Sequence, residues 1–234
     1  MTDRSPVVPV QGVIFDCDGT LMDTMDLWLT MEDEFAARCD HELTEAERDM
    51  LRACTLDETA LYYHRELGLG TSEQDVKGMV EDYAVRYYAE RSVLRPGAQA
   101  FLEELNRRDI PCAIASSSPH SMLDAGAAHT GIDVLLRAIV STDDVGISKR
   151  EPAVYEHARE LLGTPAEATW VFEDAAYALR TLAPTRFRTV GIYDKDDSGT
   201  YEQLRELADV AIRGYGELDV EEFLAGRLAS RALC

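Results

Sequence analysis

Short apolar runs that alternate with helical patterns constrain this chain more than any other feature of its sequence. Six such runs lie at residues 12–15, 111–115, 138–141, 169–172, 188–193 and 209–212. Continuous apolar runs of this length are typical of strands buried on both faces. Between them, apolar residues recur at spacings of three and four, as in Ala98, Phe101, Leu102 and Leu105, which is the period of an amphipathic helix. The alternation predicts an α/β fold with a doubly wound parallel sheet.

A helical stretch interrupts this alternation after the first predicted strand. No strand signal is found from about Met22 to Arg95, whereas three apolar stripes at helical spacing are present there. The stripes consist of Trp28, Met31 and Phe35; of Leu56, Ala60, Tyr63 and Leu67; and of Val76, Met79, Val80, Tyr83 and Tyr87. We therefore expect a core made of residues 1–21 and 96–234, and an inserted helical cap domain at residues 22–95 whose aromatic stripes are its packing face.

Composition excludes some classes of function. The 234 residues include 44 acidic and 23 basic side chains, which gives a net charge of −21. Such a balance disfavours binding to nucleic-acid phosphates. The apolar runs fall short of the roughly 18 residues that span a bilayer, and the N-terminal residues contain no apolar signal segment. We expect a cytoplasmic protein that binds neither nucleic acid nor membrane, and we favour a monomer.

Cysteine and histidine spacing does not predict a metal or redox site. The five cysteines form no Cys-x-x-Cys pair, so neither a zinc ribbon nor a redox pair is indicated, and the five histidines do not suggest a zinc site. The acidic run at residues 194–199 lacks the spacing of a calcium-binding loop. We interpret this run as a solvated loop.

Two carboxylates follow the first predicted strand. Asp16 and Asp18 are two residues apart, so in extended backbone their side chains point to the same side. Gly19 allows the chain to turn away without a side chain in the way. Because ligands of a parallel sheet bind at the carboxyl ends of its strands, both carboxylates are expected to face one pocket.

Polar residues also follow three further strands. Ser116 and Ser117 end the second run and offer hydroxyl and backbone N–H groups to an anion. Lys149 follows the third run, and Glu173 and Asp174 follow the fourth. Four carboxylates at close range repel one another unless a cation compensates them. Oxygen-only ligands with room for water and phosphate favour Mg²⁺.

In this order, the motifs resemble those of the haloacid dehalogenase-like hydrolase superfamily. The matching segments are residues 16–21 (Asp-Cys-Asp-Gly-Thr-Leu), Ser116, Lys149 with Pro152 and Tyr155, and Glu173 with Asp174. The helical insertion is similar to the type 1 cap of the branch that contains β-phosphoglucomutase and small-metabolite phosphatases. The resemblance covers the chain from Gly12 to about Tyr193.

The resemblance implies a role for each motif residue. Asp16 is implied to be the nucleophile that forms an aspartyl-phosphate, and Asp18 the general acid and base. Ser116, Ser117 and Lys149 are implied to bind the phosphoryl group. Mg²⁺ would be held by Asp16, the backbone carbonyl of Asp18, Glu173 and Asp174.

Three residues depart from the family pattern. Arg150 stands where proline is usual after the motif lysine, and Ala178 and Arg186 stand where glycines are common. These departures concern helix packing and the phosphate loop and leave the catalytic set intact.

Several activities remain open within and beyond this superfamily. Asp18 argues for an oxygen leaving group and against a dehalogenase, because halide leaves without a proton. A phosphonoacetaldehyde hydrolase would need a cap lysine for a Schiff base, and Lys77, the lysine available in the cap, is expected on a solvated helix face. The sugar-phosphate mutases carry a hinge histidine and a cap arginine where this chain has Trp28 and Leu56, so water is the expected acceptor.

The sequence thus favours a Mg²⁺-dependent phosphatase acting on a small phosphorylated metabolite such as a sugar phosphate. A phosphosugar mutase and a catalytically silent phosphate-binding or interaction module are the alternatives, and a receiver domain would lack the cap. Trp28, Arg52 and the loop at residues 53–56 are the positions expected to face the leaving group, unless they serve only to pack the cap.

Overall fold

The computed structural model of the chain describes residues 8–51, 54, 56–195 and 198–228. It divides into two compact units. The first, which we call the core unit, consists of Met1–Asp23 and Val93–Cys234. The second, which we call the helical unit, consists of Thr24–Ser92.

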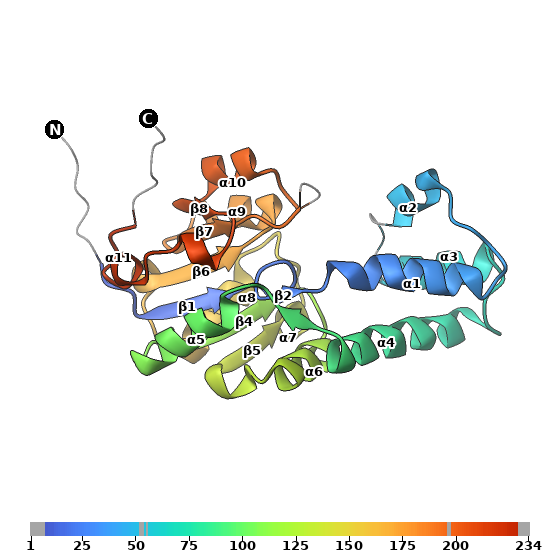
Figure 1. The fold of residues 1–234 in the computed structure, drawn as a ribbon, viewed down its shortest axis with the longest axis horizontal. Coiled ribbons are helices and arrows are strands. Elements are labelled where there is room, and N and C mark those ends of the chain that lie inside the picture. The colour runs from blue at the N-terminus through green and yellow to red at the C-terminus, as the bar shows by residue number, and fades with distance from the viewer. Residues whose placement is uncertain (1–7, 52–53, 55, 196–197, 229–234) are drawn as a thin grey trace. The chain divides into compact units, whose positions relative to one another are not determined.

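Within the described residues, a six-stranded parallel sheet forms the centre of the core unit (Figure 1). The strands lie in the order β5-β4-β1-β6-β7-β8, and neighbours pair in parallel. Their bounds are Gly12–Phe15 (β1), Cys112–Ser116 (β4), Ala138–Ser141 (β5), Thr169–Glu173 (β6), Arg188–Ile192 (β7) and Val210–Ile212 (β8). The chain builds outward from β1 first to one side and then to the other, which confirms the predicted doubly wound α/β fold.

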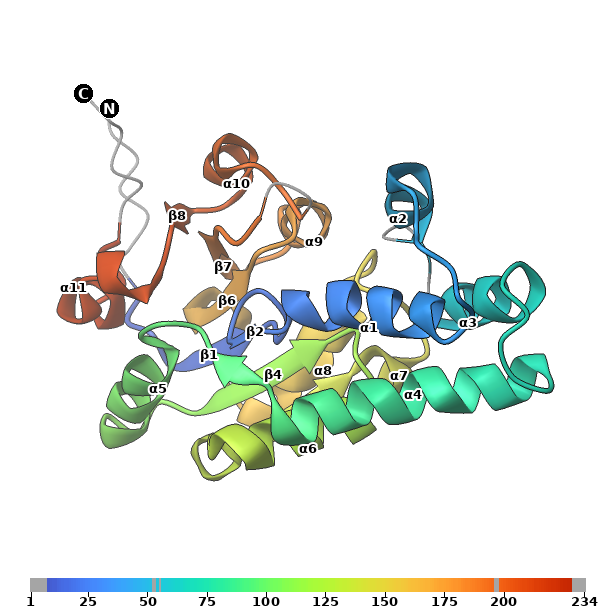
Figure 2. The same ribbon diagram turned by 45° about the vertical axis from the view of Figure 1, so that its right-hand side comes forward.

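Helices cover both faces of this sheet. In Figure 1, α5 and α6 lie in front of the strands and α8 lies behind them, an arrangement that Figure 2 shows from a second side. The helices of the core unit are α5 (Ala98–Arg107), α6 (His120–Thr130), α7 (Thr142–Val145), α8 (Ala153–Leu162), α9 (Ala176–Leu182), α10 (Tyr201–Leu207) and α11 (Val220–Leu224), with single 3₁₀ turns at Asp133–Leu135, Ala166–Ala168 and Tyr215–Glu217.

Alternation along β6 fixes which way its last residue points. The Phe172 ring packs against Phe15, Phe101 and Phe223, with ring centroids 4.9, 5.5 and 5.7 Å away. Val171 belongs instead to the buried cluster that contains Tyr155 of α8. Successive strand residues face opposite sides of a sheet. Glu173 therefore points to the same side as Val171, toward Tyr155.

The helical unit has an apolar core of its own. Its helices are α1 (Met25–Ala37), α2 (Glu45–Leu51), α3 (Leu56–Arg65) and α4 (Glu73–Glu90). The Phe35 ring stacks on Tyr63 at 5.3 Å and meets the edge of Tyr83 at 5.5 Å. Residues of all three predicted apolar stripes contribute to this core. Trp28 lies in α1, but its side chain is outside the described part of the structure.

The expectation that residues 22–95 contain no strand is wrong at both ends. Two strands of two residues each, β2 (Met22–Asp23) and β3 (Val93–Leu94), form an antiparallel pair. In the chain, β2 directly precedes the helical unit and β3 directly follows it. Both strands belong to the core unit. A strand of two residues is too short to show an alternating pattern, so its sequence carries no periodic signal.

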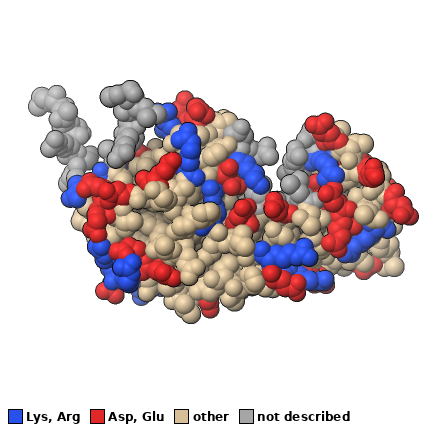
Figure 3. All heavy atoms as spheres, in the orientation of Figure 1, with Lys and Arg blue, Asp and Glu red and all other residues tan. Residues whose placement is uncertain are grey.

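The surface carries charges of both signs. Lysine and arginine side chains lie interspersed with aspartate and glutamate on the face shown in Figure 3. Within the described residues, no helix is both long and apolar enough to cross a bilayer.

Phe223 gives a test of the core packing. Its ring is fully buried and touches Trp170, Phe101 and Phe172. We expect Phe223→Ala to lower the free energy of unfolding by about 3–5 kcal/mol, as for other buried phenylalanines. Leu161→Ala is the matched control, because that side chain is 46% exposed and its loss should cost about 1 kcal/mol or less. Denaturant unfolding measures both, and equal losses would contradict the described packing.

Candidate active site

Three neighbouring strands end at the same edge of the sheet and bring the predicted residues together. Asp16 follows β1, and β1 lies between β4, which ends at Ser116, and β6, which ends at Glu173. The chain changes direction at β1, and such switch points are where parallel α/β sheets bind ligands. The carboxylate, hydroxyl and second carboxylate are thus placed side by side by strand order alone.

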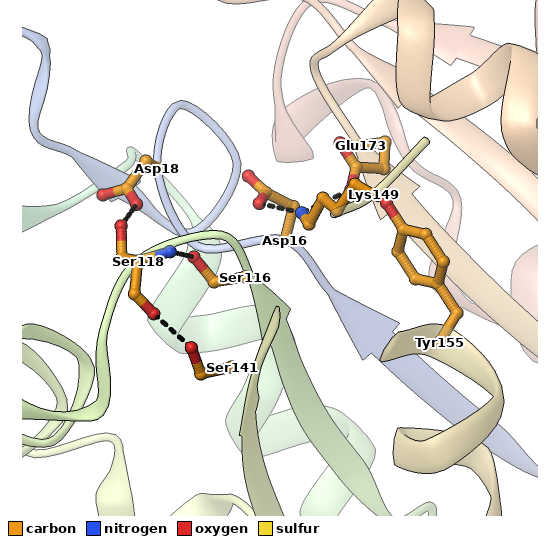
Figure 4. A network of polar contacts seen from close by, with 8 residues as sticks. All are labelled: Asp16, Asp18, Ser116, Ser118, Ser141, Lys149, Tyr155 and Glu173. Carbon is orange, nitrogen blue, oxygen red and sulfur yellow. Dashed lines mark hydrogen bonds and ion pairs between the residues drawn. The ribbon is translucent and has the colours of Figure 1, made fainter. Parts of the chain in front are cut away.

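Lys149 joins two of these strand ends. Its ammonium group donates to Asp16 and, at 2.7 Å, to Oε1 of Glu173 (Figure 4). The three residues are buried, with at most 6% of each exposed. Burial alone would lower the pKa of Lys149, but Asp16 and Glu173 raise it well above its ordinary value. The lysine is therefore a fixed positive charge.

Tyr155 completes the contacts of Glu173. The tyrosine hydroxyl donates to Oε1 of Glu173 at 2.5 Å, and the ammonium of Lys149 lies 5.5 Å from the centre of the tyrosine ring. Both described donors use the same carboxylate oxygen, so Oε2 of Glu173 is buried without a hydrogen-bond partner. Oε2 is left available for another ligand.

The carboxylates form a cluster of oxygen ligands of the kind that holds a divalent cation. Asp16, Glu173 and Asp174 each place one oxygen within 4.8 Å of the others. Oδ2 of Asp16, like Oε2 of Glu173, is buried and lacks a hydrogen-bond partner. Unpartnered buried oxygens are costly unless a ligand satisfies them. Hard oxygen donors of this kind suit Mg²⁺.

The pKa values of the clustered carboxylates also favour a bound cation. Burial raises the pKa of Asp16 well above its ordinary range, although Lys149 acts in the opposite direction. Burial and then the charge of Glu173 raise the pKa of Asp174 to about 7. One buried ammonium is thus too little positive charge for three buried carboxylates.

The Asp18 carboxylate is hydrogen-bonded to a serine. The Ser118 hydroxyl donates to Oδ2 of Asp18 at 2.7 Å, while the Ser118 backbone N–H donates to the Ser116 hydroxyl at 3.0 Å (Figure 4). The Ser141 hydroxyl in turn donates to the carbonyl of Ser118 at 2.9 Å. The serine run after β4 therefore orients the Asp18 carboxylate.

Gly19 makes the close approach of two loops possible. Its φ is +80°, and a Cβ at this position would lie 2.7 Å from Oδ2 of Asp174. A side chain would therefore be strained in the left-handed region and would also meet a candidate metal ligand. The glycine lets the loop after β1 pass directly beside the end of β6.

The remaining predicted residues have varied surroundings. Ser117 is exposed. Arg150 is also exposed, and its guanidinium lies 5.7 Å from the centre of the Tyr177 ring. Ala178 is buried in α9, and Arg186 is exposed. Arg52 lies outside the described residues, so its role and that of the Trp28 side chain stay predictions.

Two residues of the site region were missed at the level of sequence. Interpretation of the run at residues 194–199 as a solvated loop is wrong for Asp194, whose side chain is 10% exposed and pairs with Arg95 at 3.3 Å. The interpretation failed because an acidic run usually faces solvent. A weak signal was available for Arg95, a charged residue between apolar Leu94 and the Pro96 turn.

Comparison with known proteins identifies the family. Residues 10–183 match the family model of the haloacid dehalogenase-like hydrolases, and the chain belongs to that family. A relative in Cupriavidus necator, protein CbbY, is 30% identical over 196 residues, which are 77% of each chain. Hexitol phosphatase B of Escherichia coli is 24% identical over 217 residues, 92% of this chain and 97% of the relative. The family and its relatives support a phosphoric monoester hydrolase.

Solved structures share the fold. CbbY from Rhodobacter sphaeroides, in complex with phosphate, superimposes with a TM-score of 0.72 at 22% identity, and the match covers 90% of this chain and 96% of the other. At this identity the likeness establishes the fold of the chain.

Gly19→Ala tests the close approach of the two loops. The added Cβ should displace the Asp174 carboxylate, so we expect Mg²⁺ affinity, measured by titration calorimetry, to fall at least about tenfold, as when a ligand loses its support. Gly131→Ala is the matched control, because Gly131 has a φ of +73° and no atom within 4 Å of the added Cβ. The left-handed backbone alone should cost each variant about 1–2 kcal/mol of stability. Equal Mg²⁺ affinity in the two variants would contradict the described geometry.

Proposed function

We propose that this chain is a Mg²⁺-dependent phosphatase that hydrolyses a small phosphorylated metabolite, such as a sugar phosphate, through an aspartyl-phosphate on Asp16. The observation that carries the proposal is the buried carboxylate of Asp16, which Lys149 holds by one oxygen while the other oxygen has no hydrogen-bond partner. A carboxylate in this state is held in one orientation and has one oxygen free to attack.

Asp16 acts first. Its Oδ2 attacks the phosphorus of the substrate, a new bond forms between Oδ2 and phosphorus, and the bond from phosphorus to the substrate oxygen breaks. Splitting hydrolysis into two such transfers replaces one difficult step by two easier ones. The hydrogen bond from Lys149 to the other oxygen of Asp16 keeps the carboxylate from rotating during the attack.

Asp18 handles the proton in both halves of the reaction. It protonates the departing substrate oxygen, and it then removes a proton from the water that attacks phosphorus and releases Asp16. General acid–base catalysis needs a group aimed at the reacting oxygen. The hydrogen bond from Ser118 supports this role, because it fixes the direction of the Asp18 carboxylate.

Lys149 and the serine loop neutralise the phosphoryl oxygens. An ammonium group has three N–H donors, and the described contacts of Lys149 use two of them. The third N–H is assigned to a phosphoryl oxygen, together with the Ser116 hydroxyl and the exposed Ser117. Fixed donors of this kind stabilise developing charge without reorganising.

Mg²⁺ would be held by Asp16, Glu173, Asp174 and the backbone carbonyl of Asp18. When bound, it supplies charge neutralisation at the phosphoryl oxygens and the nucleophile. The unpartnered buried Oε2 of Glu173 supports this assignment.

The name of one relative supports the proposed substrate class. Hexitol phosphatase B is named for phosphate esters of sugar alcohols, and it matches 92% of this chain. A sugar phosphate or a similar small phosphate ester is therefore the proposed substrate, with water as the acceptor of the phosphoryl group.

Metal removal and loss of the nucleophile should both abolish turnover. EDTA should stop release of p-nitrophenol from its phosphate ester, and added Mg²⁺ should restore it. Asp16→Asn should lower kcat at least about 1,000-fold, or ~4 kcal/mol, because an amide is a poor nucleophile. Asp124→Asn, at a 64% exposed carboxylate on α6, is the control and should leave kcat unchanged. Full activity in EDTA or in Asp16→Asn would overturn the proposed mechanism.

The leaving group tests Asp18. An alkoxide must be protonated as it departs, whereas p-nitrophenolate leaves nearly unaided, and acid catalysis is worth roughly 10²- to 10⁴-fold where it is needed. Asp18→Asn should therefore slow phosphoryl transfer much more for alkyl phosphates than for p-nitrophenyl phosphate in single-turnover measurements. With the aryl ester, a burst of about one p-nitrophenol per site should precede slow turnover. Equal damage to the first step for both esters would show that Asp18 is not the acid.

A further inference from the structure

Arg95 makes an unusual set of contacts beside the candidate active site. It directly follows β3 and belongs to the core unit. Its guanidinium donates to the backbone carbonyl of Gly19 and, at 2.7 Å, to the carbonyl of Tyr193, and it lies 3.3 Å from a carboxylate oxygen of Asp194. Its side chain is 11% exposed. The Arg95 backbone N–H also donates to the carbonyl of Leu21 at 2.8 Å.

These contacts connect two strand ends that flank β6. Gly19 lies in the loop after β1, and Tyr193 follows β7, so the guanidinium links the loops on either side of the strand that ends in Glu173. The Arg95 backbone bond to Leu21 adds a second attachment to the loop after β1. Arg95 thus holds the loop after β1 at two points, once through its side chain and once through its backbone, and its side chain holds the end of β7 at a third.

The contact at Gly19 matters because of its neighbours in the chain. The Gly19 carbonyl belongs to the peptide that directly follows the Asp18–Gly19 peptide, whose carbonyl is assigned to Mg²⁺. A planar peptide can reorient only through the φ and ψ angles beside it. Gly19, whose φ is +80°, has no Cβ to restrict such a rotation. A donor fixed on the Gly19 carbonyl therefore restricts Asp18 as well.

Asp194 fixes the donor. A guanidinium is planar, and its N–H groups point in set directions. It can donate to two carbonyls at once only if its position is fixed. The carboxylate of Asp194 forms an ion pair with the largely buried guanidinium of Arg95. Without this partner, burial of the positive charge would be costly. A Cβ at Gly19 would lie 3.4 Å from Oδ2 of Asp194, so this carboxylate lies against the same turn.

We propose that Arg95, held by Asp194, is a positioning residue that sets the orientation of Asp18 through the Gly19 carbonyl. It does not touch the substrate. The inference rests on the proposed phosphatase function and adds to it a determinant of rate located outside the predicted motifs.

The test compares Arg95→Met and Arg95→Lys with a control of the same type. Arg188→Met removes an arginine at the other end of β7, where it pairs with Asp209 at 3.1 Å. We expect both Arg95 variants to remain folded by circular dichroism. For Arg95→Met, kcat for an alkyl phosphate at saturating Mg²⁺ should fall at least about tenfold with KM within about twofold, because the chemical step and not binding is affected. Mg²⁺ affinity of the substrate-free protein should fall as well, and Arg188→Met should change neither.

Arg95→Lys keeps the charge, but an ammonium group lacks the planar geometry with which the guanidinium contacts two carbonyls and Asp194. It should recover stability without recovering kcat. If the lysine variant regains both, charge alone is sufficient and the positioning role is wrong. If Arg95→Met changes only the unfolding temperature, Arg95 is structural and the proposal is likewise overturned. Should Arg95→Met not fold, Arg95→Lys and Asp194→Asn decide by the same measurements.

A double mutant isolates the route through Asp18. If Arg95 acts by orienting Asp18, Arg95→Met should cost less than about threefold in kcat when added to Asp18→Asn, since coupled residues are not additive. If the kcat loss of the double mutant equals the product of the two single-mutant losses, the proposal is overturned. Failure of the wild-type protein to bind Mg²⁺ or to hydrolyse any phosphate ester would instead refute the proposed function, so the two failures are distinguishable.

Discussion

The buried ammonium of Lys149, placed between Asp16 and Glu173, is the interaction on which the site depends. Three carboxylate oxygens within 4.8 Å of one another repel by at least about 3 kcal/mol per charged pair at an effective dielectric constant of about 20. Lys149 offsets part of this repulsion and orients both of its partners. The unpartnered oxygens that remain are the ones a divalent cation and a phosphoryl group would take. Removing this one charge would leave a cluster that must bind protons or open.

Strand order makes this arrangement possible. With β1 between β4 and β6, residues more than 100 positions apart in the chain come to lie at adjacent strand ends. The alternation along β6 then directs Glu173 to the Tyr155 side, where Tyr155 and Lys149 meet it. Gly19 allows the loop after β1 to approach Asp174. Chemistry at this edge thus follows from sheet register and one left-handed residue.

The sequence was sufficient to predict what depends on local pattern. Buried strands, the doubly wound sheet and a polar residue at each strand end are all visible as apolar runs followed by Asp16, Ser116 and Glu173. The contacts of Arg95 were not predictable, because its carbonyl partners lie 76 and 98 positions away and become neighbours only in the folded sheet. Two-residue strands were missed because they have no period. The use of a serine run to hold Asp18 also depends on how two loops meet.

The central claim is that Asp16 becomes phosphorylated, and trapping that species tests it most directly. The wild-type protein would be mixed with a phosphate ester and Mg²⁺, quenched within a single turnover and reduced with borohydride, which converts an aspartyl-phosphate to homoserine. Peptide mass spectrometry would then locate the change. We predict homoserine at position 16 in nearly stoichiometric amount during the burst, and none when EDTA is present. Reduction at another carboxylate, or a full burst of product with unmodified Asp16, would contradict the account.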